Sequence, residues 1–169
     1  MNRGLRLVPN LRQALKDRGD LLCRLGQYDL AKIDYNNLLR LDTRNQSAYL
    51  GLARIEAHQG ATARAQELLE QAVNFAPQSA ESYLGRSEIY REMGLLPEAV
   101  DDLLHAILLD DGQSRAMQNL IELSRESYDE VIAGLNRNIE RPPRPGMPYY
   151  VRGSDFKRHV AYATPWSGS

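Results

Sequence analysis

The stretch RLGQYDLAKIDYNNLLRLDT, from Arg24 to Thr43, decides the fold because the chain repeats its pattern twice more. The pattern returns as HQGATARAQELLEQAVNFAP at His58–Pro77 and as EMGLLPEAVDDLLHAILLDD at Glu92–Asp111, each 34 residues after the previous copy. A fixed period of this length is typical of repeat architectures, in which each unit is one supersecondary motif. We therefore interpret the chain as an array of similar units.

Five columns of the aligned copies are alike: two hold the same residue in every copy, and three hold apolar residues or tyrosine. These columns are Gly26, Gly60 and Gly94; Ala31, Ala65 and Ala99; Tyr35, Leu69 and Leu103; Leu38, Ala72 and Ala106; and Leu41, Phe75 and Leu109. The steps of four and then three from the alanine column onward predict one apolar stripe on a helix. A column of small residues indicates that two helix backbones approach closely there. The glycine, which adopts positive φ at little cost, predicts a helix C-cap.

A second helix is predicted before each glycine, and the combined pattern resembles the tetratricopeptide repeat. Its aromatic and small positions are Tyr49 and Ala53 in one copy and Tyr83 and Ser87 in the next. Pro9 and Pro77 fill the family's proline column, whereas Thr43 and Asp111 depart from it. The resemblance covers nearly the whole chain. It implies an all-α, right-handed α-solenoid of helix–turn–helix repeats with a C-terminal capping helix.

The repeat frame divides the chain into seven predicted segments. Residues 1–11 are the end of a preceding repeat or an N-terminal cap, and the first repeat helices are expected at Leu11–Leu25 and Tyr28–Leu41, with Ser47 as the next N-cap. The remaining segments are three repeats at 12–45, 46–79 and 80–113, a degenerate fourth repeat at 114–145, a capping helix at 146–163 and a disordered tail at 164–169.

Repeat four keeps the frame in its second helix only if the turn before it is two residues shorter. Tyr128 then aligns with Tyr28, and Val131 falls in the alanine column. Glu126 stands in place of the glycine, and Gly134 in mid-helix costs about 1 kcal/mol against alanine. We expect this repeat to be the least stable of the four.

Composition excludes several classes of protein. No apolar run reaches the ~18 residues that a membrane span needs. The one cysteine, Cys23, allows no internal disulfide and no cysteine cluster for zinc. Residues 1–136 carry 15 Lys and Arg against 20 Asp and Glu, and residues 137–169 carry 6 against 2, so the net charge of −1 does not indicate nucleic-acid binding. We predict a cytoplasmic protein without cofactor or metal.

Catalysis is not predicted. The three histidines, His58, His105 and His159, fall in different repeats, and the chain has no nucleophile elbow or phosphate-binding glycine loop. Cys23 has no base near it in the sequence, so a structural thiol is the expected role.

The resemblance implies that the first helices of the repeats line a concave groove. The inward columns predict a peptide-binding site formed by Lys16, Asp20, Arg24, Arg54, His58, Glu88, Arg91 and Arg125. Carboxylates of a bound peptide would meet Arg24, Arg54 and Arg91 through charge-assisted hydrogen bonds. The alternative is that these charges pair with one another, as Arg91 and Glu88 can at a spacing of three on one helix.

The sequence can be compared with the motif of the family members that bind chaperones. The carboxylate clamp of chaperone-binding members needs two lysines, two asparagines and an arginine. Lys16 fits the first lysine, but Asp20 stands where an asparagine is needed, and Ser47, Gly51 and Gly85 stand at the other positions. A negative Asp20 would repel a terminal carboxylate, so we do not expect the clamp.

We predict a non-catalytic scaffold or adaptor that binds a peptide segment of another protein in the groove, with no nucleic acid or membrane as partner. The alternatives are a holdase-type, secretion-like chaperone and a regulatory fragment of a larger multidomain protein. The segment RPPRPGMP at Arg141–Pro148 is interpreted as a stiff linker rather than as a polyproline ligand. The basic C-terminal region is a second expected contact, either with the acidic body or, by self-association, with another copy.

Overall fold

The structure, a computed structural model, describes residues 3–109 and 114–140, with side chains at 11–109 and 115–137. These residues form eight α-helices and no strand, which confirms the predicted all-α class. The helices are α1 (Arg3–Arg24), α2 (Tyr28–Leu41), α3 (Gln46–His58), α4 (Thr62–Phe75), α5 (Ala80–Glu92), α6 (Leu96–Leu109), α7 (Ser114–Glu126) and α8 (Tyr128–Glu140).

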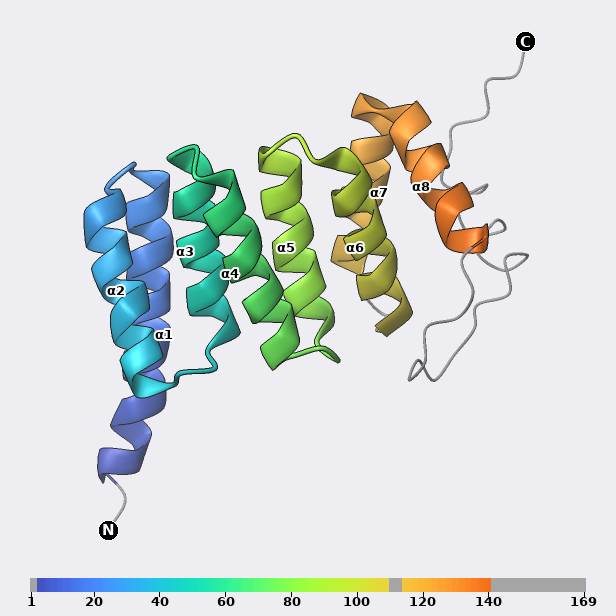
Figure 1. Ribbon diagram of the computed structural model, residues 1–169. Helices are drawn as coiled ribbons and strands as arrows, with labels where there is room; N and C mark the ends of the chain where they lie inside the picture. Colours follow the sequence, from blue (N-terminus) through green and yellow to red (C-terminus); the bar gives the residue numbers. More distant parts are fainter. Residues whose placement is uncertain (1–2, 110–113, 141–169) are drawn as a thin grey trace.

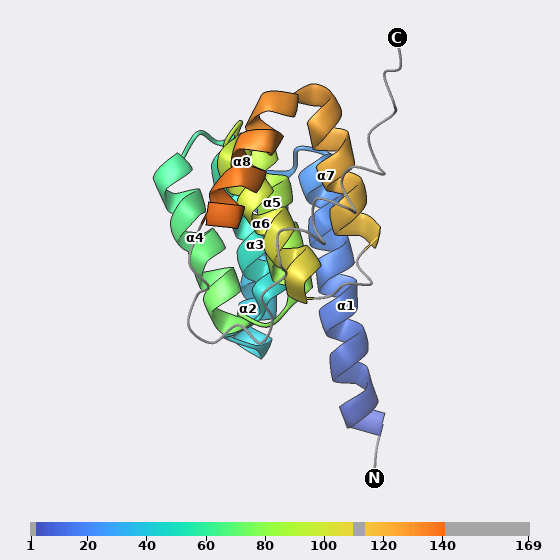
Figure 2. The same ribbon diagram turned by 90° about the vertical axis from the view of Figure 1, so that its right-hand side faces the viewer.

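Successive helices pair into antiparallel hairpins, and the hairpins follow one another in a row (Figure 1). The first helices of the hairpins form one layer and the second helices form the other, as the view along the row shows (Figure 2). α3 packs against both α1 and α5, while α8 packs against α6. A hairpin therefore buries its apolar stripes against its neighbours, which is how a repeat solenoid builds a core.

The turns inside the first three hairpins close as the glycine column predicts. Gly26, Gly60 and Gly94 have φ of 70°, 78° and 74°. In the first turn the N–H of Gln27 donates to the carbonyl of Leu22 at 2.9 Å, and the N–H of Gly26 donates to that of Cys23 at 3.0 Å. These two bonds are the Schellman arrangement that satisfies carbonyls at a helix end. It recurs in the other two turns.

The alanine column is buried, as predicted. Ala31, Ala65 and Ala99 occupy the same place in the first turn of α2, α4 and α6, and each is at most 1% exposed. Val131 takes this place in α8 and is also buried.

The fourth hairpin shows the shortened turn. One residue, Ser127, separates α7 from α8, whereas three separate α1 from α2. α8 begins at Tyr128, where the two-residue deletion places it. A residue larger than glycine would clash at position 134, because a Cβ there would lie 2.4 Å from Cγ1 of Val100 on α6. The glycine allows α8 to pack closely on α6.

Repeats one and three each carry an ion pair between the two helices of the hairpin. Arg18 Nε donates to Asp34 Oδ2 at 2.7 Å and Arg18 Nη2 to Asp34 Oδ1 at 2.5 Å. Arg86 makes the same two bonds to Asp102, both at 2.6 Å. Such two-bond pairs fix the relative position of the side chains. The corresponding columns of repeat two hold leucines.

Two predictions of helix ends are wrong. α1 runs unbroken through Pro9, where we expected one helix to end and another to begin at Leu11, and its first turns extend beyond α2 (Figure 1). A proline removes one backbone hydrogen bond, which bends a helix without necessarily ending it. Ser47 lies inside α3, and the N-cap is Asn45, whose side chain accepts from the N–H of Ala48 at 3.0 Å. The predicted capping helix and tail lie outside the described residues.

Candidate binding surface

The predicted site residues of repeats two and three lie on one face. We name the face of α1, α3, α5 and α7 that points away from the second helices the first-helix surface. Ion pairs cross it from helix to helix, and they join Arg54 of α3 to α5 and Arg91 of α5 to α7. The structure thus brings together the predicted Arg54, Glu88 and Arg91.

The α3–α5 crossing is made by Arg54. Its Nη2 lies 3.4 Å from Glu88 Oε2, and its Nε lies 3.2 Å from Glu92 Oε2. His58 Nε2 lies 3.8 Å from the same oxygen of Glu92, and the His58 ring stacks on Tyr28 with centroids 5.7 Å apart. Arg54 therefore already contacts two carboxylates of this chain.

The α5–α7 crossing uses arginines from both helices. Arg91 Nη2 lies 2.5 Å from Glu126 Oε1, and Arg91 Nη1 lies 4.0 Å from Glu122 Oε2. Arg115 Nη2 lies 2.7 Å from Glu88 Oε1, and Arg115 Nη1 lies 3.5 Å from Glu81 Oε1.

The structure shows the alternative interpretation, in which these charges pair with one another, but the pairs run between helices and not from Arg91 to Glu88 on one helix. The reason is geometric, because the neighbouring helix offers each of these side chains an opposite charge. Glu88 lies between Arg54 and Arg115. A peptide carboxylate would have to compete with these glutamates for Arg54 or Arg91.

Repeat one uses its predicted residues differently. Lys16 Nζ donates to Asp20 Oδ2 at 2.8 Å, and the hydroxyl of Tyr35 donates to Asp20 Oδ1 at 2.8 Å. Cys23 Sγ lies 3.7 Å from the same hydroxyl. Burial, the hydrogen bond to Asp20 and the contact with Cys23 raise the pKa of Tyr35. Burial also raises the pKa of the Cys23 thiol, which is consistent with the structural role predicted for it.

The remaining predicted residues are at the ends of helices. Arg24 and Arg125 are exposed, and in the part of the chain that the structure describes neither forms an ion pair.

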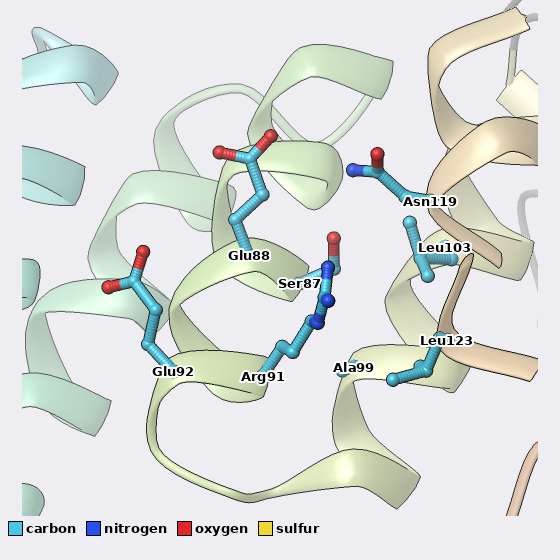
Figure 3. Close-up of a pocket in the computed structure, with 8 residues that line it drawn as sticks. All are labelled: Ser87, Glu88, Arg91, Glu92, Ala99, Leu103, Asn119 and Leu123. Carbon is cyan, nitrogen blue, oxygen red and sulfur yellow. The ribbon is translucent and has the colours of Figure 1, made fainter. Parts of the chain in front are cut away.

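A pocket opens on this surface between α5 and α7 (Figure 3). Its volume is about 390 Å³. Buried Ala99, Leu103 and Leu123 give it apolar walls, and Asn119 reaches into it from α7. Its full lining is Ser87, Glu88, Arg91, Glu92, Ala99, Leu103, Asn119 and Leu123.

The sequence analysis identified Glu88 and Arg91 of this lining but missed Ser87, Asn119 and Leu123. One column of the alignment could have revealed the pocket, since it holds Gly51, Gly85 and then Asn119. Within the described residues, no group of three or more His, Cys, Asp or Glu side chains is placed to hold a metal ion. No described helix is long and apolar enough to cross a membrane.

Known structures with this arrangement are tetratricopeptide-repeat domains. The first such domain of human RPAP3 matches with a TM-score of 0.55 at 21% identity, over 76% of this chain and 98% of that one. PilF of Pseudomonas aeruginosa matches with a TM-score of 0.59 at 18% identity, over 95% of this chain and 79% of that one. The first such domain of Spaghetti (RPAP3), solved with the HSP90 peptide SRMEEVD, matches with a TM-score of 0.52 at 21% identity, over 69% and 93%.

The chain therefore has the tetratricopeptide-repeat fold, as the sequence resemblance implied. No protein-family model matches it. Cellulose synthase 1 operon protein C of Komagataeibacter xylinus is 32% identical over 121 residues, which are 68% of this chain. The chain spans 9% of the length of that relative.

Proposed function

We propose that the protein is a non-catalytic scaffold or adaptor that binds a peptide segment of a partner protein on the first-helix surface. One observation carries the proposal: the ion pairs from α3 to α5 and from α5 to α7 run across a single continuous face that contains most of the predicted site. Tetratricopeptide-repeat domains of similar fold were solved with HSP90 and HSP70 peptides, which supports a peptide as ligand.

The partner need not be a chaperone C-terminus. Asp20 lies 2.8 Å from Lys16, the one residue that fits the carboxylate clamp, and this contact occupies the lysine charge. Asp20 also accepts the hydrogen bond of Tyr35, so it cannot turn away without leaving a buried hydroxyl unpaired. The single free thiol of Cys23 is compatible with a reducing compartment such as the cytoplasm.

The test exchanges the two charges of the shortest ion pair between α5 and α7, and the longer 4.0 Å contact of Arg91 with Glu122 is lost in the exchange. A variant with Arg91→Glu and Glu126→Arg keeps an opposite pair between α5 and α7 but changes which charge a ligand meets at each place. The matched control exchanges Arg64 and Glu67, which pair at 2.7 Å on the second helix α4.

Both variants are used to capture partners from an extract of cells that express the protein, with capture quantified by mass spectrometry. We expect the Arg91/Glu126 exchange to lower capture of the main partner by roughly tenfold or more, because complementary charges fix register and suppress wrong contacts. The Arg64/Glu67 exchange should leave capture unchanged. Equal capture by the two variants would place the binding site elsewhere on the molecule.

A further inference from the structure

The pocket between α5 and α7 has filled counterparts at the two preceding junctions of the solenoid. Between α1 and α3 the ring of Tyr35 lies against Gly51, where a Cβ would come within 2.2 Å of Tyr35 Cζ. Between α3 and α5 the side chain of Leu50 lies against Gly85, where a Cβ would come within 2.6 Å of Leu50 Cδ1. At both junctions glycine lets a bulky side chain occupy the space between first helices.

The third junction lacks this arrangement. Asn119 stands in the glycine column. Leu103 stands in the column of Tyr35, as Leu69 does at the second junction, and Leu84 stands in the column of Leu50. α1 packs on α3, and α3 packs on α5, but the backbones of α5 and α7 lie farther apart and the two helices meet through the side chains of their ion pairs. A pocket of about 390 Å³ remains, with Ala99, Leu103 and Leu123 as apolar walls.

The polar groups at the mouth of the pocket suit a peptide. Asn119 has no hydrogen-bond partner among the described residues, and its amide, which points into the pocket, offers both a donor and an acceptor (Figure 3). These are the two groups that the backbone of an extended peptide requires.

The network of ion pairs around the pocket has a negative net charge, and Arg125 near the end of α7, which is unpaired among the described residues, is not part of it. The network of paired side chains contains three arginines and five glutamates, a net charge of −2 with His58 neutral. Its members are Arg54, Arg91 and Arg115 with Glu81, Glu88, Glu92, Glu122 and Glu126. Arg91, the one cation of the lining, faces two of these glutamates. A ligand that enters here gains from a positive charge beside its apolar group.

We propose that this pocket binds a leucine-sized aliphatic side chain of an extended peptide segment, with a lysine or arginine next to it in the ligand. The proposal rests on the proposed function and specifies the class of partner: a segment that carries an aliphatic residue followed by a basic residue. It reverses the expectation that partner carboxylates meet Arg54 and Arg91.

The test uses the full chain labelled with 15N and three defined probes: acetyl-Leu-Lys-amide, acetyl-Leu-Glu-amide and acetyl-Gly-Lys-amide. We expect saturable amide shifts at Ser87, Leu103, Asn119 and Leu123 with the Leu-Lys probe. The Leu-Glu probe should bind roughly tenfold more weakly because of charge repulsion, and the Gly-Lys probe should bind still more weakly because it lacks the apolar group.

Two variants close the pocket. The double variant Leu103→Tyr with Asn119→Gly copies the Tyr35–Gly51 filling of the first junction. Asn119→Leu alters one partly exposed residue of α7 and keeps the variant test available if the double variant does not fold. Each folded variant should lose the Leu-Lys shifts while its circular dichroism at 222 nm matches that of the parent.

Three results would overturn the proposal: no saturable shifts at the pocket, equal binding of the Leu-Lys and Leu-Glu probes, or unchanged binding after Asn119→Leu. The proposed function and the pocket proposal can fail separately, because different measurements test them. Loss of partner capture in the Arg91/Glu126 exchange, together with no probe binding, would refute the pocket and retain the surface. Probe binding together with unchanged partner capture would retain the pocket and refute the first-helix surface as the partner's binding site.

Discussion

Repeats two and three fill the same place in their hairpins with opposite chemistry. Repeat three has the ion pair of Arg86 with Asp102, and repeat two has Leu52 and Leu68, which lie in one apolar cluster. In the first three repeats the two columns change together, since each of these repeats has either two charges or two apolar side chains there. A lone charge at this place would lack its partner in a buried environment, which is why we attribute the paired change to packing.

Repeat one sharpens the comparison because it has the same ion pair at the end of the row. The side chain of Arg18 is 64% exposed, whereas that of Arg86 is 17% exposed. Arg86 also lies over the rings of Tyr83 and Tyr90, 5.5 and 5.6 Å from their centroids. Leucines fill the corresponding columns of repeat one. The same two residues thus sit in different surroundings.

The largest effect is expected from Arg86→Leu alone. Asp102, only 6% exposed, would lose the guanidinium that makes two hydrogen bonds to it. Removal of one partner from a buried pair costs about 3 kcal/mol or more. Urea unfolding followed by circular dichroism at 222 nm checks this, and an unchanged midpoint would mean that water replaces the arginine.

Arg18→Leu should destabilise the protein less. Arg18 is the solvent-facing partner of its pair, so its removal opens Asp34 to water, which can hydrate the carboxylate. Among the residues that the structure describes, no aromatic ring lies over Arg18 as Tyr83 and Tyr90 lie against Arg86. The urea midpoint should fall by less than in Arg86→Leu, and an equal or larger fall would show that burial of the carboxylate, not of the arginine, sets the cost.

The double variant Arg86→Leu with Asp102→Leu copies repeat two into repeat three. Exchange of a whole buried ion pair for apolar side chains is commonly neutral or stabilising, so we expect the free energy of unfolding to stay within about 1 kcal/mol of the parent or to rise. The coupling between the two single variants measures the pair itself. A double variant as unstable as Arg86→Leu would show that the hairpin requires the two hydrogen bonds.

The smallest effect is expected from Tyr90→Phe, which keeps a ring over Arg86 and removes the hydroxyl. Burial raises the pKa of Tyr90, and the nearby Arg86 partly opposes this. Because the folded-state pKa lies above the usual value of about 10, the contribution is complete below that pH and is lost as the pH rises through the folded-state pKa.

Near neutral pH the variant should therefore match the parent within about 0.5 kcal/mol. Between pH 9 and pH 11 the parent should lose more stability than the variant. Thermal unfolding at a series of pH values measures this, and parallel curves for the two proteins would show that Tyr90 does not titrate differently in the folded state.

Most of the fold could be predicted from the repeat period. It predicted the start of α2 at Tyr28 and, through the two-residue deletion, the start of α8 at Tyr128. The first prediction rests on local geometry, since a helix stripe and a glycine turn are visible in a short window of the sequence. The second rests on alignment with the earlier repeats, because Glu126 replaces the glycine there. The unbroken α1 was missed because proline marks a bend in a helix as readily as an end.

Less of the candidate site could be predicted from the sequence. The inward columns named Arg54, Glu88 and Arg91 correctly as neighbours on one face, but not which charge each would meet. Partners 34 or 38 residues apart meet only once the hairpins stack. The repeat boundaries and the binding role of this set stay predictions.

The sequence by itself determined the class of fold, since a 34-residue period with a glycine turn and a buried alanine requires stacked helical hairpins. Only the tertiary structure decided what the spaces between hairpins contain. Tyr35 and Leu50 fill two junctions against glycines, and a pocket remains at the third, where asparagine stands in the glycine column and the backbones of the first helices lie farther apart. The residue pattern that defines the fold lies within each repeat and can be seen in the sequence. A junction is formed by side chains of two repeats, so its packing cannot be predicted from either repeat alone.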